Sequence, residues 1–562
     1  MKFSEIKYER FVVQNLITCY NSAKTVIENA KNVEEILSVR KGVVEVYSKL
    51  DTAFNLAYIR WSQNTANEFY NAEKRYYEEN IPLVLESESG YINAILNSEF
   101  LDEIKGNIPE ILLEIYQSKL IANNPKITKD IIIENLESSN YSNFISALTV
   151  DFNGENIPFT VLKKYMVDSD REVRKNAYNA LGERLEKDAE FLNSNFNNLV
   201  KIRTKMAKKL GFDNFTKLGY YRMNRIGYTR NDISKFRDAV VKYIVPTVNR
   251  IKRKIYDKML INEPKLYDND VSVCGNVNPI FTGNNLFLKG ADLYAEMSNE
   301  TNEFFNFMIN GELFDCLSRV NKWGGGYQTD LKDYNAPFIF ANFNGSSQDV
   351  DVLTHEGGHA YASYLAFKNG VDKELGMPFM DVAETHSMSM EFFAYKYVDK
   401  FFGSNAKKYI LQHFVDSFCF IPYGVMVDAF QELIYADYEL TPENRNLVWK
   451  MLEKRFRPHL SSAGITYLEK GTRWQYQMHI YESPFYYIDY ALAEVVALQF
   501  LFLSLDDYDL AFKKYNEFVS YGASMSFTDL INKVGLKSPF DENTIKEISL
   551  KATTLFDKLF TN

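Results

Sequence analysis

Apolar positions recur three or four residues apart through the first half of the chain, with charged residues between them. From residue 8 to about residue 260 this spacing is nearly continuous, as at Val26, Ala30 and Val33. Because such a period gathers the apolar side chains on one helical face, this half is predicted to be almost entirely helical. Breaks are expected where glycine, asparagine and proline gather, at residues 80–82, 106–109, 124–125 and 154–158.

The pattern changes after residue 268. Residues 268–281 are rich in glycine, asparagine and proline and are predicted to form a long surface loop between two halves of the molecule. Two runs typical of β-strands follow, at residues 323–330 and 336–343. Pro337, near the start of the second run, suits an edge strand, to which an extended peptide could add as a further strand.

A helix is expected next. It would begin at Ser346, which with Asp349 resembles a capping box, and end near residue 369, before Gly370. His355 and His359 lie one turn apart in this helix, so both imidazoles can bind one ion. Glu356 points beside them, where a base must be to take a proton from a water that a metal activates.

Two histidines could also fall four residues apart by chance, with a glutamate between them for solubility. The chain has only six histidines, however, which makes this spacing a rare accident. Gly357 and Gly358 each cost about 1 kcal/mol in a helix interior relative to alanine. We therefore expect another part of the protein to approach this helix closely.

A catalytic zinc needs a third protein ligand and an open position for water. Residues 380–393 have a helical period that places Glu384 and Glu391 two turns apart on one face, among apolar neighbours. Since buried carboxylates need a metal or a polar partner, Glu384 is predicted as the third ligand and Glu391 as the acceptor that orients a ligand histidine. His386 fits an ordinary buried histidine better than a ligand.

The run from residue 479 to residue 491 is the last candidate. Ser483 and Pro484 suit a helix start, which would place Tyr486 and Tyr490 on one face. Phenols, with the imidazole of His479, can donate hydrogen bonds to the oxyanion of a tetrahedral intermediate. The alternative is a set of core aromatics, which are common at helical spacing in a chain with 38 tyrosines.

Composition narrows the possible partners and location. The formal net charge is −10, and no Lys/Arg stripe marks a groove, so nucleic-acid binding is disfavoured. The N-terminal residues lack the apolar core of a signal peptide, and the apolar run 490–505 is short and interrupted by Glu494 and Gln499. We therefore expect no membrane partner and a cytoplasmic location. The four scattered cysteines are expected to be free thiols.

In their order, these stretches resemble the thimet-oligopeptidase-like zinc peptidases, and most closely the oligoendopeptidase F branch. There, Asn-Phe-Asn-Gly leads into the His-Glu-x-x-His helix, as residues 342–345 do here, and glutamates follow at the spacings of Glu384 and Glu391. A C-terminal histidine, Pro-Phe-Tyr and further tyrosines are matched by His479 and residues 484–490. Ile488 replaces one usual tyrosine, which leaves open whether Tyr486, Tyr487 or Tyr490 faces the oxyanion.

The resemblance implies a mainly α fold, a two-lobed helical shell around a deep channel with one small β-sheet near the zinc helix. Residues 1–150 would form an N-terminal helical region, and residues 151–562 a catalytic region with interleaved lobes. Such a channel admits short unfolded peptides and excludes folded proteins.

The resemblance also implies roles for single residues. One zinc ion would be held by His355, His359 and Glu384, with Glu391 behind them. Glu356 would deprotonate the attacking water and later protonate the leaving amine, while His479 with Tyr486 or Tyr490 would stabilise the oxyanion. Substrate-binding residues are expected in the glycine run, the strand and the tyrosine cluster: Gly325, Gly326, Tyr327, Phe340, Asn342 and Tyr487.

Two other interpretations remain open. A zinc carboxypeptidase on a related helical fold shares the His-Glu-x-x-His helix but removes single C-terminal residues. A non-catalytic peptide-binding protein could keep a structural zinc, but structural sites are normally closed by a fourth protein ligand, and Glu356 would then have no task.

Overall fold

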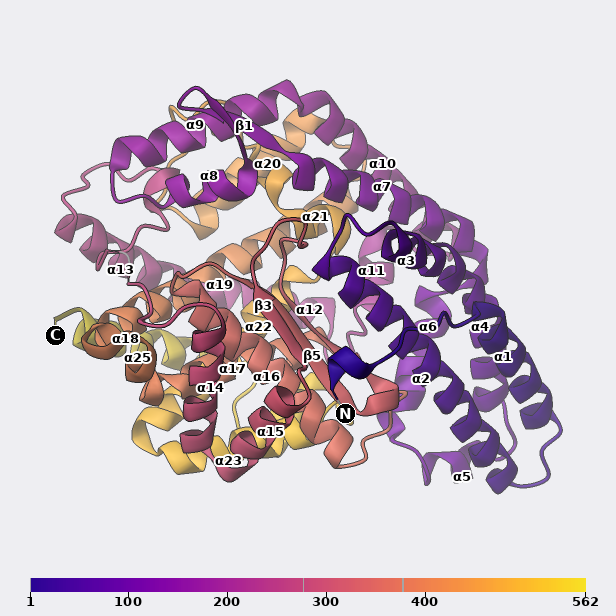
Figure 1. The fold of residues 1–562 in the computed structure, drawn as a ribbon. Coiled ribbons are helices and arrows are strands. Elements are labelled where there is room, and N and C mark those ends of the chain that lie inside the picture. The colour runs from indigo at the N-terminus through magenta and orange to yellow at the C-terminus, as the bar shows by residue number, and fades with distance from the viewer. Residues whose placement is uncertain (1, 276, 377–378, 562) are drawn as a thin grey trace.

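Helices dominate the computed structural model, which describes residues 2–275, 277–376 and 379–561 (Figure 1). The helical prediction for the first half is confirmed, and α1 to α6 stand together at the right of Figure 1. The first seven helices are α1 (Val13–Glu28), α2 (Val33–Gln63), α3 (Glu68–Asn80), α4 (Leu85–Leu96), α5 (Leu101–Lys105), α6 (Glu110–Ala122) and α7 (Thr128–Ala147).

A β-hairpin interrupts the helices at residues 149–158, where the sequence indicated only a helix break. Its strands β1 (Thr149–Phe152) and β2 (Glu155–Pro158) pair antiparallel. Asn153 and Gly154 join them with positive φ angles of 54° and 83°, as a tight two-residue hairpin turn requires. The helices that follow are α8 (Phe159–Met166), α9 (Arg171–Lys187), α10 (Ala189–Lys209), α11 (Phe215–Arg222), α12 (Arg230–Ala239) and α13 (Val245–Lys258).

The predicted long connection is present between α13 and α14 (Asn284–Met297). Among its described residues, only a single 3-10 turn at Leu266–Asp268 is regular. Asn276 lies outside the described residues. α15 (Asn299–Asn310) follows and leads into the small sheet.

The three-stranded sheet corrects one prediction. Its strands are β3 (Phe314–Leu317), β4 (Tyr327–Leu331) and β5 (Ala336–Phe343), in the order β3-β5-β4, with β5 parallel to β3 and antiparallel to β4. The prediction that residues 336–343 form an edge strand is therefore wrong, because β5 is the central strand. The four-residue β3 is too short to show an alternating pattern, and it takes the edge that β5 was expected to leave open.

Side chains donate hydrogen bonds to backbone carbonyls of this sheet. On β4, the amide of Asn55 from α2 donates to the carbonyl of Asp330 at 2.9 Å. The Lys322 ammonium lies between β3 and β5, since it donates to the carbonyls of Asp315 and Leu317, each at 2.9 Å, and to that of Ala341 at 2.6 Å. Gly326, directly before β4, lies beside α16, with its Cβ position 3.8 Å from Oε1 of Glu356.

α16 (Gln348–Lys368) begins differently from the prediction. No capping box forms at Ser346; the carboxylate of Asp349 instead accepts the backbone N–H groups of Asn344, at 2.9 Å, and Gly345, at 2.7 Å. The predicted end is confirmed, since Gly370 has a φ of 68° directly after the helix. Residues 377–378, before α17 (Met380–Phe393), lie outside the described residues.

The C-terminal helices complete the core around α17, which packs between α16 and α22. They are α18 (Asp399–Phe402), α19 (Ala406–Ala436), α20 (Pro442–Phe456), α21 (Met478–Glu482), α22 (Tyr487–Asp506), α23 (Tyr508–Ser520), α24 (Phe527–Lys533) and α25 (Glu542–Thr561). Two stretches, Asp399–Ala436 and Tyr487–Asp506, have the length and apolar composition of a membrane span, and both lie mostly inside the fold. The four cysteines are free thiols, as predicted.

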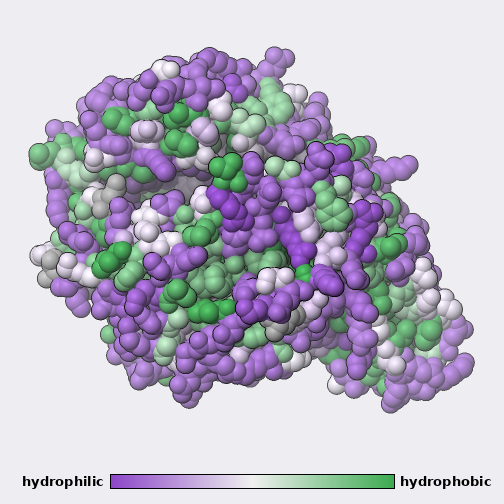
Figure 2. Space-filling model, viewed as in Figure 1, coloured by the Kyte–Doolittle hydropathy of each residue, from purple (hydrophilic) through white to green (hydrophobic). Residues whose placement is uncertain are grey.

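The helices form separate bodies around the sheet. In Figure 1, α8, α9, α10 and α20 form an upper body, and α14 to α18 with α23 and α25 form a lower one. The face drawn in Figure 2 is hollowed between these two bodies. α16 and α17 thus lie beneath the hollow, beside the sheet (Figure 1).

Candidate metal centre and active site

Three predicted ligands come together where α16 crosses α17. The Nε2 atoms of His355 and His359 lie 3.4 and 3.6 Å from the Oε2 atom of Glu384, and one ligand atom from each residue lies within 4.8 Å of the others. Two imidazoles and one carboxylate are the protein ligands of a common type of catalytic zinc site, which keeps a fourth position open. The donor set therefore fits one zinc ion.

Glu391 orients one of these histidines. Its Oε1 atom lies 2.6 Å from Nδ1 of His355, which leaves Nε2 free to face the ligand cluster. Its Oε2 atom lies 2.6 Å from Nε2 of His413 on α19, and the other nitrogen of His413 lies 2.7 Å from the Tyr395 hydroxyl. The carboxylate is thus held from both sides, an arrangement that fixes ring orientation at metal sites.

His413 and Tyr395 were not singled out in the sequence. His413 lies 22 residues from Glu391 and on another helix. No local spacing links such residues, so only the fold reveals the contact.

The ionisation of Glu384 and His359 suits a cation, whereas Glu384 and Glu391 raise the pKa of His355, which must lose its proton to bind a metal. Burial alone would raise the pKa of Glu384, but the hydrogen bond from His355 and the nearby imidazoles lower it to about 2. Burial lowers the pKa of His359 to about 4, so this ring is neutral at physiological pH. A neutral imidazole and an ionised carboxylate are the forms that bind metals.

Glu356 lies next to the ligand cluster and has a carboxylate oxygen without a hydrogen-bond partner among the described residues. It is 9% exposed, and that oxygen is Oε2. Burial raises the pKa of Glu356 to about 7. A general base works best with a pKa near the working pH, so this environment suits proton transfer.

The two glycines of the motif allow two close contacts. A Cβ atom on Gly357 would lie 2.0 Å from the Tyr294 hydroxyl, and one on Gly358 would lie 2.7 Å from the backbone carbonyl of His386. The expectation of a close approach to this helix is confirmed. Gly358 lets α17 pack directly against α16, which brings Glu384 to the histidines.

His386 takes no part in the cluster. It is completely buried, its ring lies 5.6 Å from that of Phe518, and neither ring nitrogen has a partner within the described chain. Burial lowers its pKa to about 3. This fits the interpretation of His386 as a buried core residue.

The predicted helix start at Ser483 and Pro484 is wrong. α22 begins at Tyr487, and Phe485 before it adopts a φ of 71° in a turn. This conformation is strained for a side chain with a Cβ atom. It is held by tertiary contacts: the Phe485 N–H donates to Gln431 at 3.0 Å, and its carbonyl accepts from Arg225.

The turn aims Tyr486 at the ligand cluster. Its hydroxyl donates to Oε1 of Glu384, whereas the histidines' Nε2 atoms approach the other oxygen, Oε2. Tyr490 lies beside it, with ring centroids 4.9 Å apart, whereas Tyr487 packs against Phe420 and Tyr423. Ile488 is fully buried, so the departure at this position leaves the three phenols in place.

His479 is held in one tautomer by its neighbours. Tyr423 donates to Oε1 of Gln477 at 2.5 Å, and the Gln477 amide nitrogen donates to Nδ1 of His479 at 3.1 Å. The proton of the neutral ring is therefore on Nε2. Burial lowers the pKa of His479 to about 4, so it donates as a neutral imidazole.

The glycine run lies beside Glu356, but two neighbouring residues that were expected to bind substrate, Asn342 and Phe340, have structural roles instead. The Cβ position of Gly326 lies 3.8 Å from Oε1 of Glu356. The Asn342 amide donates to the carbonyls of Trp323 and Gly325, each at 2.7 Å, and so holds the run in shape. Phe340 is completely buried and stacks on Tyr327 at 5.0 Å, so its side chain is not open to a peptide.

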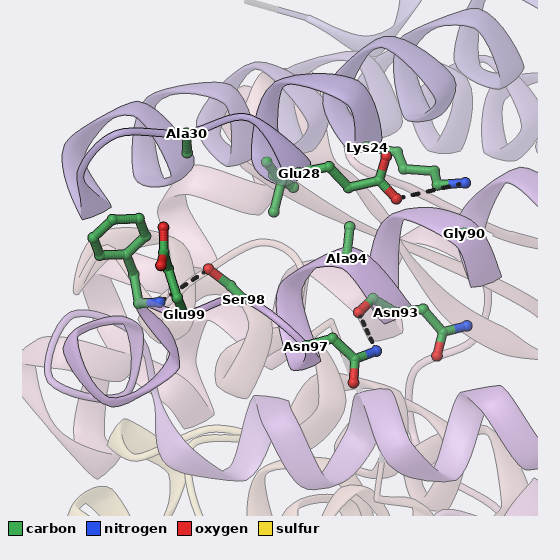
Figure 3. A pocket seen from close by; sticks show the side chains of 11 residues that line it. Lys24, Glu28, Ala30, Gly90, Asn93, Ala94, Asn97, Ser98 and Glu99 are labelled. Carbon is green, nitrogen blue, oxygen red and sulfur yellow. Dashed lines mark hydrogen bonds and ion pairs between the residues drawn. The ribbon is translucent and has the colours of Figure 1, made fainter.

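A separate pocket of about 460 Å³ lies between α1 and α4, at the edge of the molecule and away from α16 (Figures 1 and 3). Figure 3 shows the Lys24–Glu28 ion pair and the Asn93–Asn97 hydrogen bond at its rim. Both contacts are local pairs one helical turn apart. None of the described lining residues belongs to the ligand cluster.

A mainly helical fold with a buried His-Glu-x-x-His helix, a third carboxylate and flanking phenols defines a metallopeptidase. The family model described as peptidase family M3 matches residues 164–550, and that of the peptidase M3 N-terminal domain matches residues 3–122. The chain belongs to peptidase family M3.

Similar proteins bear related names. The oligopeptidase PepF of Bacillus subtilis is 22% identical over 91% of this chain and 78% of its own length. An oligoendopeptidase F homologue of Borreliella burgdorferi is 23% identical over 83% of this chain and 79% of its length. The solved structure of PZ peptidase A with an inhibitor has a TM-score of 0.94 and 34% identity, and covers 99% of both chains.

Proposed function

We propose that this peptidase is a zinc metalloendopeptidase that hydrolyses internal bonds of short unfolded peptides. The observation that carries the proposal is the placement of the unengaged Glu356 carboxylate beside the cluster of His355, His359 and Glu384. The names of the similar oligopeptidases support peptides as the substrate class.

His355, His359 and Glu384 would hold the zinc. When bound, zinc supplies Lewis-acid polarisation of the substrate carbonyl and lowers the pKa of the water that attacks it. Glu356 accepts the proton of that water on its free oxygen and later donates it to the leaving amine. Its pKa of about 7 allows both steps near neutral pH.

The oxyanion side is formed by the C-terminal segment. His479 presents its Nε2–H, and Tyr486 or Tyr490 presents a phenol that carries its proton, because burial raises the pKa of both tyrosines well above 10. Such donors stabilise the charge that develops on the carbonyl oxygen.

The substrate backbone would lie along the glycine run. Gly326 lacks a side chain that would fill the space beside Glu356, and Gly325 leaves room for the Trp323 ring. The adjoining edge of β4 can pair with an extended peptide. Tyr487 would line the wall on the opposite side. This assignment replaces β5 by β4 as the strand that receives the peptide.

We place the boundary between the N-terminal helical region and the catalytic region near residue 150, a division supported by the separate matches to residues 3–122 and 164–550. The acidic net charge supports a protein without a nucleic-acid partner. We propose a cytoplasmic location and no membrane partner.

The test combines one variant with product mapping. Glu356→Gln is expected to lower kcat by at least about 10³-fold while metal analysis still finds one zinc per chain. A mixed peptide pool, analysed by mass spectrometry with and without a chelator, should give internal cleavage products only without chelator. Removal of single C-terminal residues alone would favour the carboxypeptidase, and unchanged hydrolysis by Glu356→Gln would refute the assigned base.

A further inference from the structure

Two arginines near the tyrosine cluster carry guanidinium nitrogens that meet no acceptor. Arg457 follows α20 and is 5% exposed, and its Nη1 atom has no hydrogen-bond partner. Arg473 begins the 3-10 turn Arg473–Tyr476, and its Nε and Nη1 atoms are buried without a partner. Neither arginine joins an ion pair within the described residues.

This arrangement is costly for the folded protein. A buried charge loses its hydration, and each N–H group without an acceptor leaves part of that cost uncompensated. Burial and the neighbouring Arg473 lower the pKa of Arg457, whereas Tyr423, Tyr476 and Glu453 raise that of Arg473 despite its burial. Local penalties of this kind are expected where a ligand supplies the missing partner.

The position of the pair connects it to the oxyanion side. The Cζ atoms of Arg457 and Arg473 lie over the Tyr423 ring, 5.1 and 4.4 Å from its centroid. The hydroxyl of Tyr423 holds Gln477, which holds His479. Tyr423 also packs on Tyr487 at 5.8 Å, and Tyr487 on His479 at 4.8 Å.

These contacts set a short distance between the arginines and the reacting bond. An extended peptide advances by roughly 3.3 Å per residue. A few residues of substrate therefore span from the oxyanion donors to the guanidinium groups. The cation–π contacts with the Tyr423 ring help to hold the two guanidinium groups in place. Nη1 of each group still has no hydrogen-bond partner among the described residues.

We propose, on the basis of the peptidase function above, that Arg457 and Arg473 form a subsite for a carboxylate of the peptide substrate, a few residues from the cleaved bond. A guanidinium fork binds a carboxylate with two parallel hydrogen bonds. The carboxylate is either the C-terminus of a short peptide or an acidic side chain. A subsite for the C-terminus selects peptides short enough to reach it while their internal bond lies beside Glu356.

Matched peptides test this subsite through kinetics. Three internally quenched peptides of one sequence carry a free C-terminus, a C-terminal amide, or an amide with a glutamate near the end. Wild type should cleave at least one carboxylate-bearing peptide roughly tenfold to a hundredfold faster, in kcat/KM, than the neutral amide. The two carboxylate-bearing peptides distinguish the terminus from the side chain as the source.

Variants assign that preference to the arginines. Arg473→Met and Arg457→Met should remove most of the preference, and Arg473→Lys should keep part of it. Arg455 lies two residues before Arg457 and forms an exposed ion pair with Asp238 of α12, so Arg455→Met serves as the control and should keep the preference entirely. Thermal unfolding checks that the Arg473 and Arg457 variants are folded. If these folded variants keep the wild-type ratio of kcat/KM between the carboxylate-bearing and neutral peptides, the subsite is overturned.

A binding measurement is independent of any arginine variant. Calorimetry on the zinc-loaded Glu356→Gln protein should show tighter binding of the preferred carboxylate peptide than of the neutral amide by a similar factor. Equal affinities for all three peptides would overturn the subsite. If wild type cleaves all three equally, the subsite fails but the peptidase function stands; if it cleaves none, the peptidase function itself fails.

Discussion

Single side chains at the site are oriented by partners from distant parts of the chain. Glu391 and His413 fix the ring of His355, and Gln477 fixes the tautomer of His479. Each of these contacts engages Nδ1 of the ring and leaves Nε2 free for another partner. The catalytic geometry is therefore set by a shell of hydrogen bonds behind the residues that react.

Removal of the carboxylate behind His355 should weaken metal binding. Glu391→Ala leaves the imidazole free to rotate and without its acceptor, so zinc affinity should fall about 10- to 100-fold. A titration against a competing chelator measures the affinity. Glu303→Gln, which alters an exposed carboxylate paired with Lys368 on α16, serves as the control and should bind zinc as wild type does.

The phenols should differ in their contribution to the rate. Tyr486→Phe removes the hydroxyl that contacts Glu384 and should lower kcat by about 10²-fold with little change in KM. Tyr487→Phe should change kcat far less, because this ring packs against Phe420 and Tyr423. Steady-state kinetics on one peptide compares them, and an equal loss in both variants would contradict the assignment.

Among the elements, the contact between α16 and α17 carries the metal centre. Gly358 is the point of closest approach, since a Cβ atom there would lie 2.7 Å from the backbone of α17. A glycine at this position costs some helix stability, but its lack of a side chain allows the two ligand-bearing helices to pack closely. Gly42 in α2, by contrast, has open space around its Cβ position.

The two glycines should respond with opposite signs to the same substitution. Gly358→Ala forces α17 away and should lower the free energy of unfolding by about 1–3 kcal/mol, with loss of zinc affinity. Gly42→Ala should raise it by up to about 1 kcal/mol, because alanine is the better helix former. Chemical denaturation measures both values. A Gly358 variant as stable as wild type would contradict the packing argument.

The elements differ in how well their sequence predicts them. α17 was predicted to its exact residues and α16 closely at its end, because their own periods and Gly370 determine them. The start of α22 was missed, since the conformation of Phe485 depends on Gln431 and Arg225 from other elements. The ligands could likewise be predicted from spacing, whereas His413 and Gln477 act through contacts that only the folded chain creates.

Across the whole molecule, the N-terminal helices are tied to the segment that precedes α17. Arg40 of α2 pairs with Asp372 at 2.6 Å and Glu374 at 2.8 Å, and Tyr116 of α6 donates to Glu374 at 2.6 Å. A single buried apolar cluster extends from Phe3 to Phe556. The N-terminal region thus shares its core with the catalytic region.

Loss of this link should destabilise the protein as a whole. Arg40 is 8% exposed, so Arg40→Met leaves two partly buried carboxylates without their cation and should cost about 2–3 kcal/mol. The melting temperature should fall in one cooperative transition. Lys2→Met, which removes an exposed ion pair with Glu312, should leave the melting temperature unchanged. A separate early transition of the N-terminal helices would contradict a shared core.

The edge of β4 has a consequence for the behaviour of many copies together. Free strand edges act as templates for self-association, and a protein that gathers extended peptides beside a sheet is especially exposed to this hazard. β4 is only five residues long, and Asn55 of α2 occupies its Asp330 carbonyl. A short edge strand with an occupied carbonyl limits such pairing between copies.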